Sequence, residues 1–150
     1  MDLSNLISLE TIYPNMKVSS KKQLLQELGN MAKDKIGKPI LEIANVLMER
    51  ERLGSTGVGH GVAIPHGRFS DLDQICGIFV KLDKPVNYDS LDDQPVDLIF
   101  LLLVPEEAGA DHLKALAKVS RIFRDQSICD KLRGAENSDA IYAILNSVQQ

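Results

Sequence analysis

The residues best suited to chemistry lie in one glycine-rich stretch, GSTGVGHGVAIPHGR, which covers residues 54–68. Near its end, Pro65 fixes its own φ and holds Ile64 extended, while Gly67 leaves room beside His66. This pattern predicts a solvent-reachable imidazole at a stiff strand end. An imidazole has an ordinary pKa of about 6.5, so it is mostly neutral and nucleophilic in the cytosol. We therefore expect His66 to attack an electrophile such as a phosphoryl group.

A phosphoryl group on an imidazole needs a donor and a cation nearby, because it brings about two negative charges and three acceptor oxygens. His112 is a candidate donor, since Asp111 is suited to cap a helix whose first turn would hold His112 and favour an anion. Arg50 is the candidate cation, near the end of another predicted helix. Arg52 would point about 200° away around that helix, so we expect only one of the two arginines at the site.

Each of these residues also has a structural interpretation. A single histidine after a proline is more often structural than catalytic, and the charge cluster Glu49–Arg52 is typical of a solvated helix face. We interpret His60 as a solvated loop residue and Glu106–Glu107 as a solvated loop rather than an acid/base pair. The hydroxyls of Ser55 and Thr56 are further candidate donors. The glycine-rich stretch lacks the Gly-Lys-Ser/Thr ending of a nucleotide-binding P-loop.

A zinc site is an alternative of a different class, because His60, His66 and His112 together could supply three ligands. The six-residue spacing between His60 and His66, across a flexible loop, matches no regular ligand pattern. We therefore expect neither a metal nor a cofactor.

Apolar periodicity predicts the helices that must position these residues. A helix is predicted to follow Ser20, which has capping-box spacing to Gln23, and to stop at Gly37. Pro39 suits the first turn of a second helix, which runs out near Arg52. Three helices are predicted in the last third of the chain: one along the stripe from Leu113 to Phe123, one over Ser127–Leu132 and one capped by Ser138.

Three apolar runs between these helices predict strands, namely Val62–Ile64, Ile75–Val80 and Val96–Val104. The last run is apolar enough for a central strand covered on both faces. The order of elements predicts an α/β fold, a single-domain sandwich over residues 1–150 with a central mixed β-sheet flanked by helices on both faces. The order of the strands is not predictable from this pattern.

Composition narrows the class of protein. The 150 residues suit one domain, and a hydrophobic content of 44% is ordinary for a packed globular protein. A net charge of −4 argues against binding to nucleic acid or to an anionic membrane surface. The longest apolar run, Leu98–Pro105, is too short to cross a membrane. Cys76 and Cys129 read as buried free thiols, so we expect a cytoplasmic protein.

Beyond these patterns, the segment LMERERLGSTGVGHGVAIPHGR, residues 47–68, closely resembles the phosphorylation-site region of the mannitol/fructose-type IIA domains of the bacterial phosphotransferase system. The resemblance continues through DDQPVDLIFLLLVP at residues 92–105 and DHLKALAKVSRIFRD at residues 111–125. It covers roughly residues 5 to 147 and is greatest for the nitrogen-regulatory branch of that family. Its elements appear in the family's order, which makes the combination specific.

The resemblance implies a role for each candidate residue. The family's phosphorylated histidine falls on His66, its second active-site histidine on His112 and its arginine on Arg50. The phosphoryl group would be carried on Nε2, after transfer from the histidine of an HPr-like carrier that enzyme I charges from phosphoenolpyruvate. His60 stands where we expect asparagine in many relatives, so no role is carried over to it.

The function implied is that of a phosphotransferase with a phosphohistidine intermediate, in a relay from protein to protein. In the nitrogen-regulatory branch, the phosphorylation state would signal to regulatory targets such as potassium-transport proteins or sensor kinases. The alternative is a IIA component of a fructose- or mannitol-type transporter, which would pass the group to a IIB domain. The regulatory partner, the donor and the oligomeric state are left open by the sequence.

Overall fold

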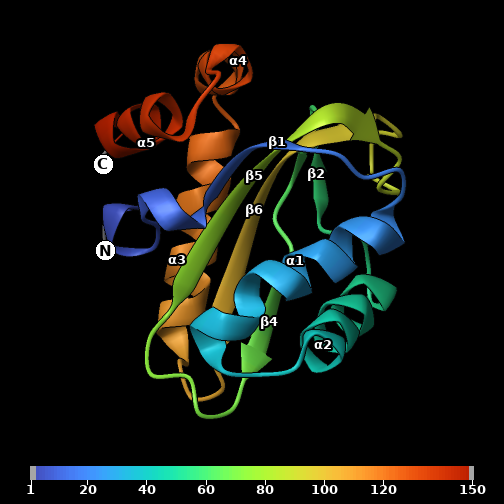
Figure 1. Cartoon of the computed structure of the whole chain (residues 1–150), viewed down its shortest axis with the longest axis vertical. Coiled ribbons are helices and arrows are strands. Elements are labelled where there is room, and N and C mark those ends of the chain that lie inside the picture. Colours follow the sequence, from blue (N-terminus) through green and yellow to red (C-terminus); the bar gives the residue numbers. More distant parts are fainter. Residues whose placement is uncertain (1–2, 149–150) are drawn as a thin grey trace.

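A six-stranded mixed sheet crosses the molecule, seen in a computed structural model that describes residues 3–148 (Figure 1). Its spatial order is β1-β5-β6-β3-β2, with β4 also pairing with β6. β5 and β6 are antiparallel to each other, whereas β3 and β4 both run parallel to β6. The strands are β1 (Ile12–Met16), β2 (Gly57–Gly59), β3 (Val62–Ala63), β4 (His66–Phe69), β5 (Cys76–Val86) and β6 (Val96–Pro105).

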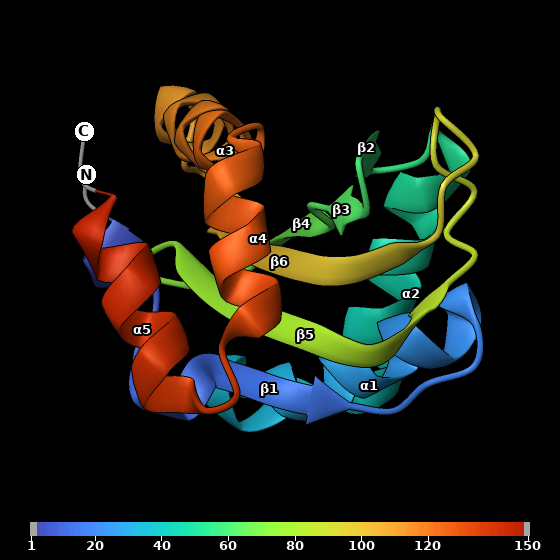
Figure 2. The same cartoon turned by 90° about the horizontal axis from the view of Figure 1, so that it is seen from above.

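Helices cover both faces of this sheet. Figure 2 shows α1 and α2 on one side of the strands and α3, α4 and α5 on the other. The helices are α1 (Lys21–Ile36), α2 (Ile40–Arg52), α3 (Ala110–Phe123), α4 (Gln126–Gly134) and α5 (Ser138–Ser147), with short 3-10 turns at Leu3–Asn5 and Leu9–Thr11. The predicted sandwich with a central mixed sheet is confirmed.

The central strand β6 divides the core into two layers. Its successive side chains point to opposite faces, so Phe100 and Leu102 pack in the layer that includes α3, α4 and α5. Ile99 and Leu101 pack in the layer that includes α1 and α2. A strand buried on both faces reads as a continuous apolar run, which is why this strand was predictable.

Local signals set most helix ends where the sequence predicts them. The Ser20 side chain accepts a hydrogen bond from the Gln23 backbone N–H at 3.1 Å, at the start of α1. Gly37 ends that helix in the left-handed conformation, with φ of 66°. Pro39 immediately precedes α2 and serves as its N-cap residue.

Other predicted boundaries were wrong. Gly109, with φ of 58°, precedes α3 as the N-cap residue, so Asp111 lies inside the first turn and does not cap it. Asn137 rather than Ser138 caps α5, through a hydrogen bond from the Ala140 N–H to the Asn137 side chain at 2.8 Å. The capping residue lies two residues before the predicted cap in α3 and one residue before it in α5.

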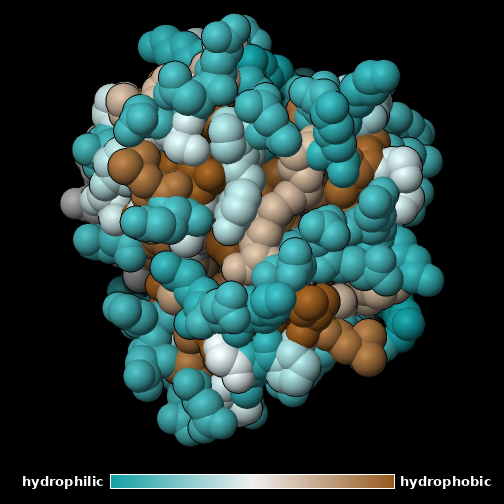
Figure 3. All heavy atoms as spheres, viewed as in Figure 1, coloured by the Kyte–Doolittle hydropathy of each residue, from teal (hydrophilic) through white to brown (hydrophobic). Residues whose placement is uncertain are grey.

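β1 was not predicted at all. It is a five-residue edge strand that contains Pro14, and proline is tolerated in sheets mainly at edges. Figure 3 shows apolar surface among hydrophilic residues in the middle of the face that carries β1 and α1. Half-buried side chains of these two elements that pack on the core include Tyr13, Met16 and Met31.

β3 and β4 form one strand interrupted by Ile64–Pro65. Both halves keep the same register against β6, with Val62 opposite Leu98 and His66 opposite Leu102. Proline has no backbone N–H, so the ladder is broken there while the strand direction is preserved. The predicted strand therefore continues past Pro65, and His66 begins its second half.

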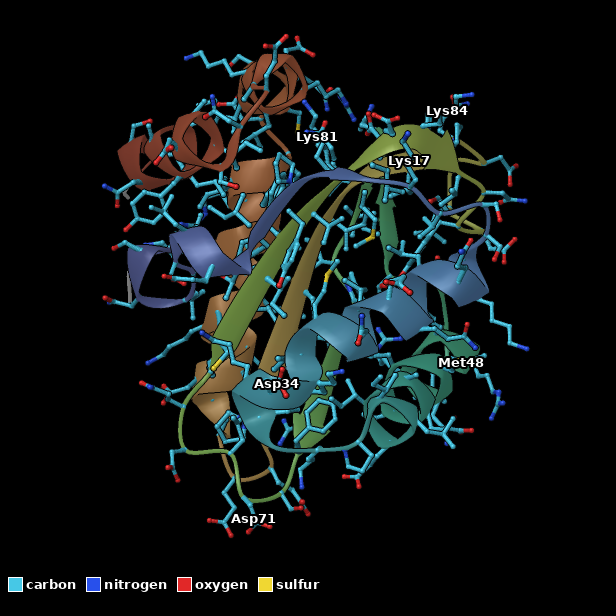
Figure 4. All side chains as sticks on the ribbon, viewed as in Figure 1. Lys17, Asp34, Met48, Asp71, Lys81 and Lys84 are labelled. Carbon is cyan, nitrogen blue, oxygen red and sulfur yellow. The ribbon has the colours of Figure 1, made fainter. Side chains whose placement is uncertain are left out.

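Charged side chains tie α4 to the sheet. Lys81, labelled in Figure 4 beneath α4, donates to the backbone carbonyls of Arg133 at 2.9 Å and Ala135 at 2.5 Å. Arg133 in turn holds Asp97 of β6 through both carboxylate oxygens.

Among residues 3–148, none of the helices has the length and apolarity that a membrane span requires.

Candidate functional site

His66 lies near the edge of the sheet away from β1, on a strand between α2 and α3 (Figure 2). Its side chain is only 8% exposed, so the predicted open imidazole was wrong in degree. The cover comes from elements distant in sequence: the imidazole contacts Arg50 of α2 and His112 of α3. The ring is thus largely desolvated and does not project freely into water.

Two contacts determine which ring nitrogen of His66 carries the proton. Nδ1 lies 3.0 Å from the backbone carbonyl of Ile64, which can only accept, so Nδ1 is the protonated nitrogen. Nε2 lies 3.2 Å from Nε of Arg50, which can only donate, so Nε2 holds the lone pair. The break in the ladder at Pro65 leaves the Ile64 carbonyl available for this bond. Nε2 is therefore the nitrogen whose lone pair is suited to nucleophilic attack.

Arg50 reaches His66 because α2 approaches β4 very closely. A Cβ atom at Gly67 would lie 2.8 Å from Cγ1 of Val46, one helical turn before Arg50. Only glycine permits this approach without displacing the helix. Arg50 also donates from Nη1 to the Gly54 carbonyl at 2.9 Å, which fixes the guanidinium across the end of the helix. Arg52 points elsewhere and pairs with the exposed Glu49, as the helical spacing predicts.

His112 lies in the first turn of α3, 9% exposed, and its ring meets the ring of His66 edge-on. The two ring centroids are 5.3 Å apart and the ring planes make an angle of 61°. The structure thus brings together the three residues singled out from the sequence. Nε2 of His112 is buried and has no hydrogen-bond partner among the described residues.

Arg68 is a site residue that the sequence did not single out. Its Nη2 lies 3.1 Å from Nδ1 of His112, and its Nη1 donates to the Glu106 carbonyl at 3.1 Å. The contact joins β4 to α3, residues 44 apart in the sequence. The only available signal was alternation, since residues two apart on a strand share a face and Arg68 follows His66 by two.

The buried carboxylate of Glu51, next to Arg50 in the chain, was also not predicted from the sequence. Glu51 forms an ion pair with Lys21 of α1 at 2.9 Å, and its side chain is only 6% exposed. It accepts from the Thr56 backbone N–H at 3.0 Å and from the Thr56 hydroxyl. That hydroxyl also lies 3.1 Å from the hydroxyl of Tyr88, whose burial raises its pKa well above the ordinary value. This cluster anchors the loop that follows α2.

The loop hydroxyls therefore have structural partners. Ser55 donates to the Tyr88 backbone carbonyl at 3.1 Å, and Thr56 is bound to Glu51. The prediction that these hydroxyls serve as donors at the site is not supported by their hydrogen bonds. Glu106 and Glu107 are exposed in the loop before α3, as predicted.

The local electrostatics keep both imidazoles neutral. Burial is the main factor that lowers the pKa of His66, with a smaller lowering by the Arg50 charge, while the Ile64 hydrogen bond and Glu51 act in the opposite direction. Burial also lowers the pKa of His112, helped by His66, Arg68 and Arg50. A neutral ring retains the lone pair that nucleophilic attack requires.

The three histidines do not form a cluster of metal ligands. His60 is exposed in the turn between β2 and β3, where its backbone N–H donates to the Asp92 side chain at 2.9 Å. Within residues 3–148, no group of three His, Cys, Asp or Glu side chains is placed to hold a metal ion. The zinc alternative therefore has no geometric support, and the loop interpretation of His60 is confirmed.

Exposed leucines lie next to the site residues in the chain. Leu53, directly after α2, is 85% exposed, and Leu113, beside His112, is 67% exposed. Single exposed apolar side chains are ordinary on protein surfaces. We propose these two leucines as contacts for a partner protein because each is next to a helix that supplies a site residue. We call Leu53 and Leu113 the leucine rim.

Comparisons with known proteins identify the same family as the sequence resemblance. Residues 5–148 match the family described as "Phosphoenolpyruvate-dependent sugar phosphotransferase system, EIIA 2". A nitrogen regulatory protein of Bradyrhizobium diazoefficiens is 52% identical over 145 residues, which cover 97% of this chain and 95% of that protein. The fructose-specific EIIABC component of Bacillus subtilis is 33% identical over 148 residues, which cover 97% of this chain and 23% of that protein.

Solved structures agree with this assignment. Nitrogen regulatory protein IIA-Ntr from Neisseria meningitidis matches with a TM-score of 0.91 and 39% identity, over 95% of this chain and 98% of that chain. Mannitol IIA from Escherichia coli shares the fold, with a TM-score of 0.78 and 20% identity, over 93% of this chain and 98% of that chain. This chain therefore belongs to the EIIA type-2 family of the phosphoenolpyruvate-dependent phosphotransferase system, whose members are phosphotransfer proteins.

Proposed function

We propose that this protein accepts a phosphoryl group on Nε2 of His66 from the phosphohistidine of an HPr-like carrier, and that its phosphorylation state regulates other proteins. The observation that carries the proposal is the position of Nε2, which holds a lone pair and lies 3.2 Å from the Arg50 guanidinium. A neutral nucleophile and a cation are thus already adjacent. Phosphoryl transfer depends mainly on such positioning and electrostatics.

In this mechanism the Nε2 lone pair forms the bond to phosphorus. The bond between phosphorus and the donor's imidazole nitrogen breaks, and its electron pair returns to the donor ring. Nδ1 of His66 keeps its proton and donates a hydrogen bond to the Ile64 carbonyl at 3.0 Å. Because that bond stabilises the positive charge on the phosphorylated ring, it favours the covalent intermediate.

The added charge is offset by groups around the ring. Arg50 gives up its bond to the lone pair and turns its N–H groups toward the phosphoryl oxygens. His112 offers a neutral ring whose centroid lies 5.3 Å away, and the Arg68 guanidinium, which contacts Nδ1 of that ring, adds a second positive charge. Charges and hydrogen-bond donors around the ring therefore stabilise the phosphoryl dianion in this mechanism.

The regulatory part of the proposal rests on the relatives. The Bradyrhizobium nitrogen regulatory protein is 52% identical to this chain, whereas the Bacillus fructose component is 33% identical. We infer a regulatory output, with targets such as potassium-transport proteins or sensor kinases that distinguish the two charge states of the site. The free thiols of Cys76 and Cys129 suit a cytoplasmic location.

Transfer to a IIB domain is the competing function within the same chemistry. One solved relative, the mannitol IIA of Escherichia coli, is described in a complex with phosphorylated IIB. At 17% identity this likeness shows the shared fold alone. Incubation of the phosphorylated protein with a purified IIB domain separates the functions, because a regulator keeps its label and a transport component loses it.

The proposal is tested by incubating the protein with enzyme I, an HPr-like carrier and labelled phosphoenolpyruvate. We expect acid-labile label on the native chain and on His60→Ala, and none on His66→Ala. His60 is the matched control because it is an exposed histidine of the same glycine-rich stretch. Circular dichroism confirms that each variant is folded. Acid-labile label that persists on folded His66→Ala refutes the proposal.

A further inference from the structure

We propose that Arg68 is a positioning residue, which keeps the proton of the neutral His112 ring on Nε2 so that this N–H is free to bind a phosphoryl oxygen at His66. The inference rests on the proposed function of His66. Arg68 is not one of the three site residues predicted from the sequence, which are Arg50, His66 and His112. Its evidence is the chain of contacts from Glu106 through Arg68 to His112.

The first step concerns Nδ1 of His112. It lies 3.1 Å from Nη2 of Arg68, and a guanidinium has donors only. Nδ1 must therefore accept, and it can accept only when it carries no proton. In a neutral imidazole the single proton then resides on Nε2, because the bond made by one ring nitrogen sets the state of the other.

The second step concerns Nε2 of His112. This atom is buried and has no partner within the part of the chain that the structure describes. A buried N–H without an acceptor is rare in native proteins, because its lost hydration is not replaced. A phosphoryl oxygen on the neighbouring ring, whose centroid is 5.3 Å away, would supply the missing acceptor. The unpaired donor is thus explained as one that is satisfied in the phosphorylated state.

The third step concerns how Arg68 is held. Its other terminal nitrogen donates to the Glu106 carbonyl at 3.1 Å, and its backbone lies on β4 opposite Val104 of β6. The guanidinium therefore bridges the end of β6 and the first turn of α3. Because it binds His112 on the Nδ1 side, it acts on the phosphoryl group through that ring.

The experiment measures the proton position directly, with nitrogen NMR on the unphosphorylated protein labelled with ¹⁵N at histidine. In the native chain we expect His112 with a bare Nδ1 and a protonated Nε2. In Arg68→Met we expect a mixture of the two neutral forms. Arg68→Lys keeps a donor and should restore the native form. Arg121→Met is the matched control at the other end of α3, and it should leave the His112 signals unchanged.

Transfer rates give the functional readout. We expect Arg68→Met to lower the rate of phosphoryl transfer to His66 on the order of tenfold, by analogy with the loss of an outer hydrogen-bond partner of a metal-binding histidine. Arg68→Lys should recover most of that rate. Equal proton positions in the native protein and Arg68→Met, or a native His112 with its proton on Nδ1, would overturn the inference. The outcome is separate from the His66 label, because the NMR measurement needs no phosphorylation.

Discussion

Contacts with a backbone carbonyl and with two arginines determine which ring nitrogen carries the proton on each imidazole of the site. The Ile64 carbonyl and Arg50 make Nε2 of His66 the lone-pair nitrogen. Arg68 selects the opposite arrangement of donors for His112, with a free N–H at Nε2. The result is one ring prepared to form a bond and one ring prepared to donate to the group that arrives.

Arg50→Met tests the cation at the residue scale. The variant loses both the donor to Nε2 and the positive charge beside the phosphoryl group, so we expect the single-turnover transfer rate to fall about 100-fold, as when one preorganised donor is removed from a charged transition state. Arg50→Lys should recover part of the rate, since it restores charge without the planar fork. Arg52→Met is the control, because Arg52 pairs with exposed Glu49. An Arg50→Met rate equal to the native one would contradict the assignment.

A second prediction concerns pH. Burial lowers the pKa of both His66 and His112 in the folded protein, whereas in the unfolded chain each titrates near about 6.5. The unfolded state therefore binds more protons below that value. We expect the free energy of unfolding to have its full value above about pH 6.5. It should decline as the pH falls through the folded-state pKa values. Urea titrations from neutral to mildly acidic pH measure this decline, which should shrink in the double variant His66→Gln/His112→Gln. An equal decline in that variant would show that the two histidines are not the source of the pH dependence.

At the scale of elements, the closeness of α2 to β4 decides whether Arg50 reaches His66. Gly67 and Val46 form the contact, one helical turn from the arginine. The interrupted strand provides the other half of the arrangement, because Pro65 leaves the Ile64 carbonyl free while the register against β6 continues. The hydrogen bonds from Thr56 to Glu51 then fix the loop that leaves the helix.

Gly67→Ala tests this packing. Its Cβ would lie 2.8 Å from the Val46 side chain, so α2 must shift away and carry Arg50 with it. We expect a loss of about 1–2 kcal/mol in the free energy of unfolding, as for other overpacked sites, together with slower transfer to His66. The double variant Gly67→Ala/Val46→Ala removes the clashing methyl groups and should restore part of the rate. If the rate of Gly67→Ala matches the native rate, the close approach is not what positions Arg50.

Features whose cause is local in the chain were predictable from the sequence. Helix ends at Ser20 and Gly37 and the buried run of β6 follow from local chemistry, and the structure has them where expected. The cover over His66 and the contact of Arg68 depend on elements far apart in the chain. No local pattern encodes how near two such elements come. β1 escaped prediction because Pro14 argues against a strand unless the edge position is already known.

At the scale of the whole molecule, the site lies between α2 and α3, and the leucine rim extends from both helices. Leu53 and Leu113 are among the most exposed large apolar residues of the chain. Under the proposed function, a donor protein presents its phosphohistidine across this rim. We therefore expect docking on the exposed leucines to be separable from chemistry on the buried rings.

Leu113→Asp tests the rim as a docking surface. We expect transfer from the HPr-like carrier to weaken about tenfold through a higher KM, since a buried apolar contact is replaced by a charge. Phosphorylation by a small-molecule donor such as phosphoramidate should be unaffected. Leu41→Asp is the control, because Leu41 is 69% exposed at the opposite end of α2 from Leu53. Equal losses with both donors would show that Leu113 affects the chemical step and not the docking of the carrier.

Nε2 of His66 is the atom that we propose forms the bond to phosphorus. Phosphorus–nitrogen couplings in the phosphorylated protein, labelled with ¹⁵N at histidine, identify the bonded atom directly. We expect a coupling to Nε2 of His66, with Nδ1 of the same ring still protonated. A coupling to Nδ1 of His66, or to either nitrogen of His112 or His60, would contradict it.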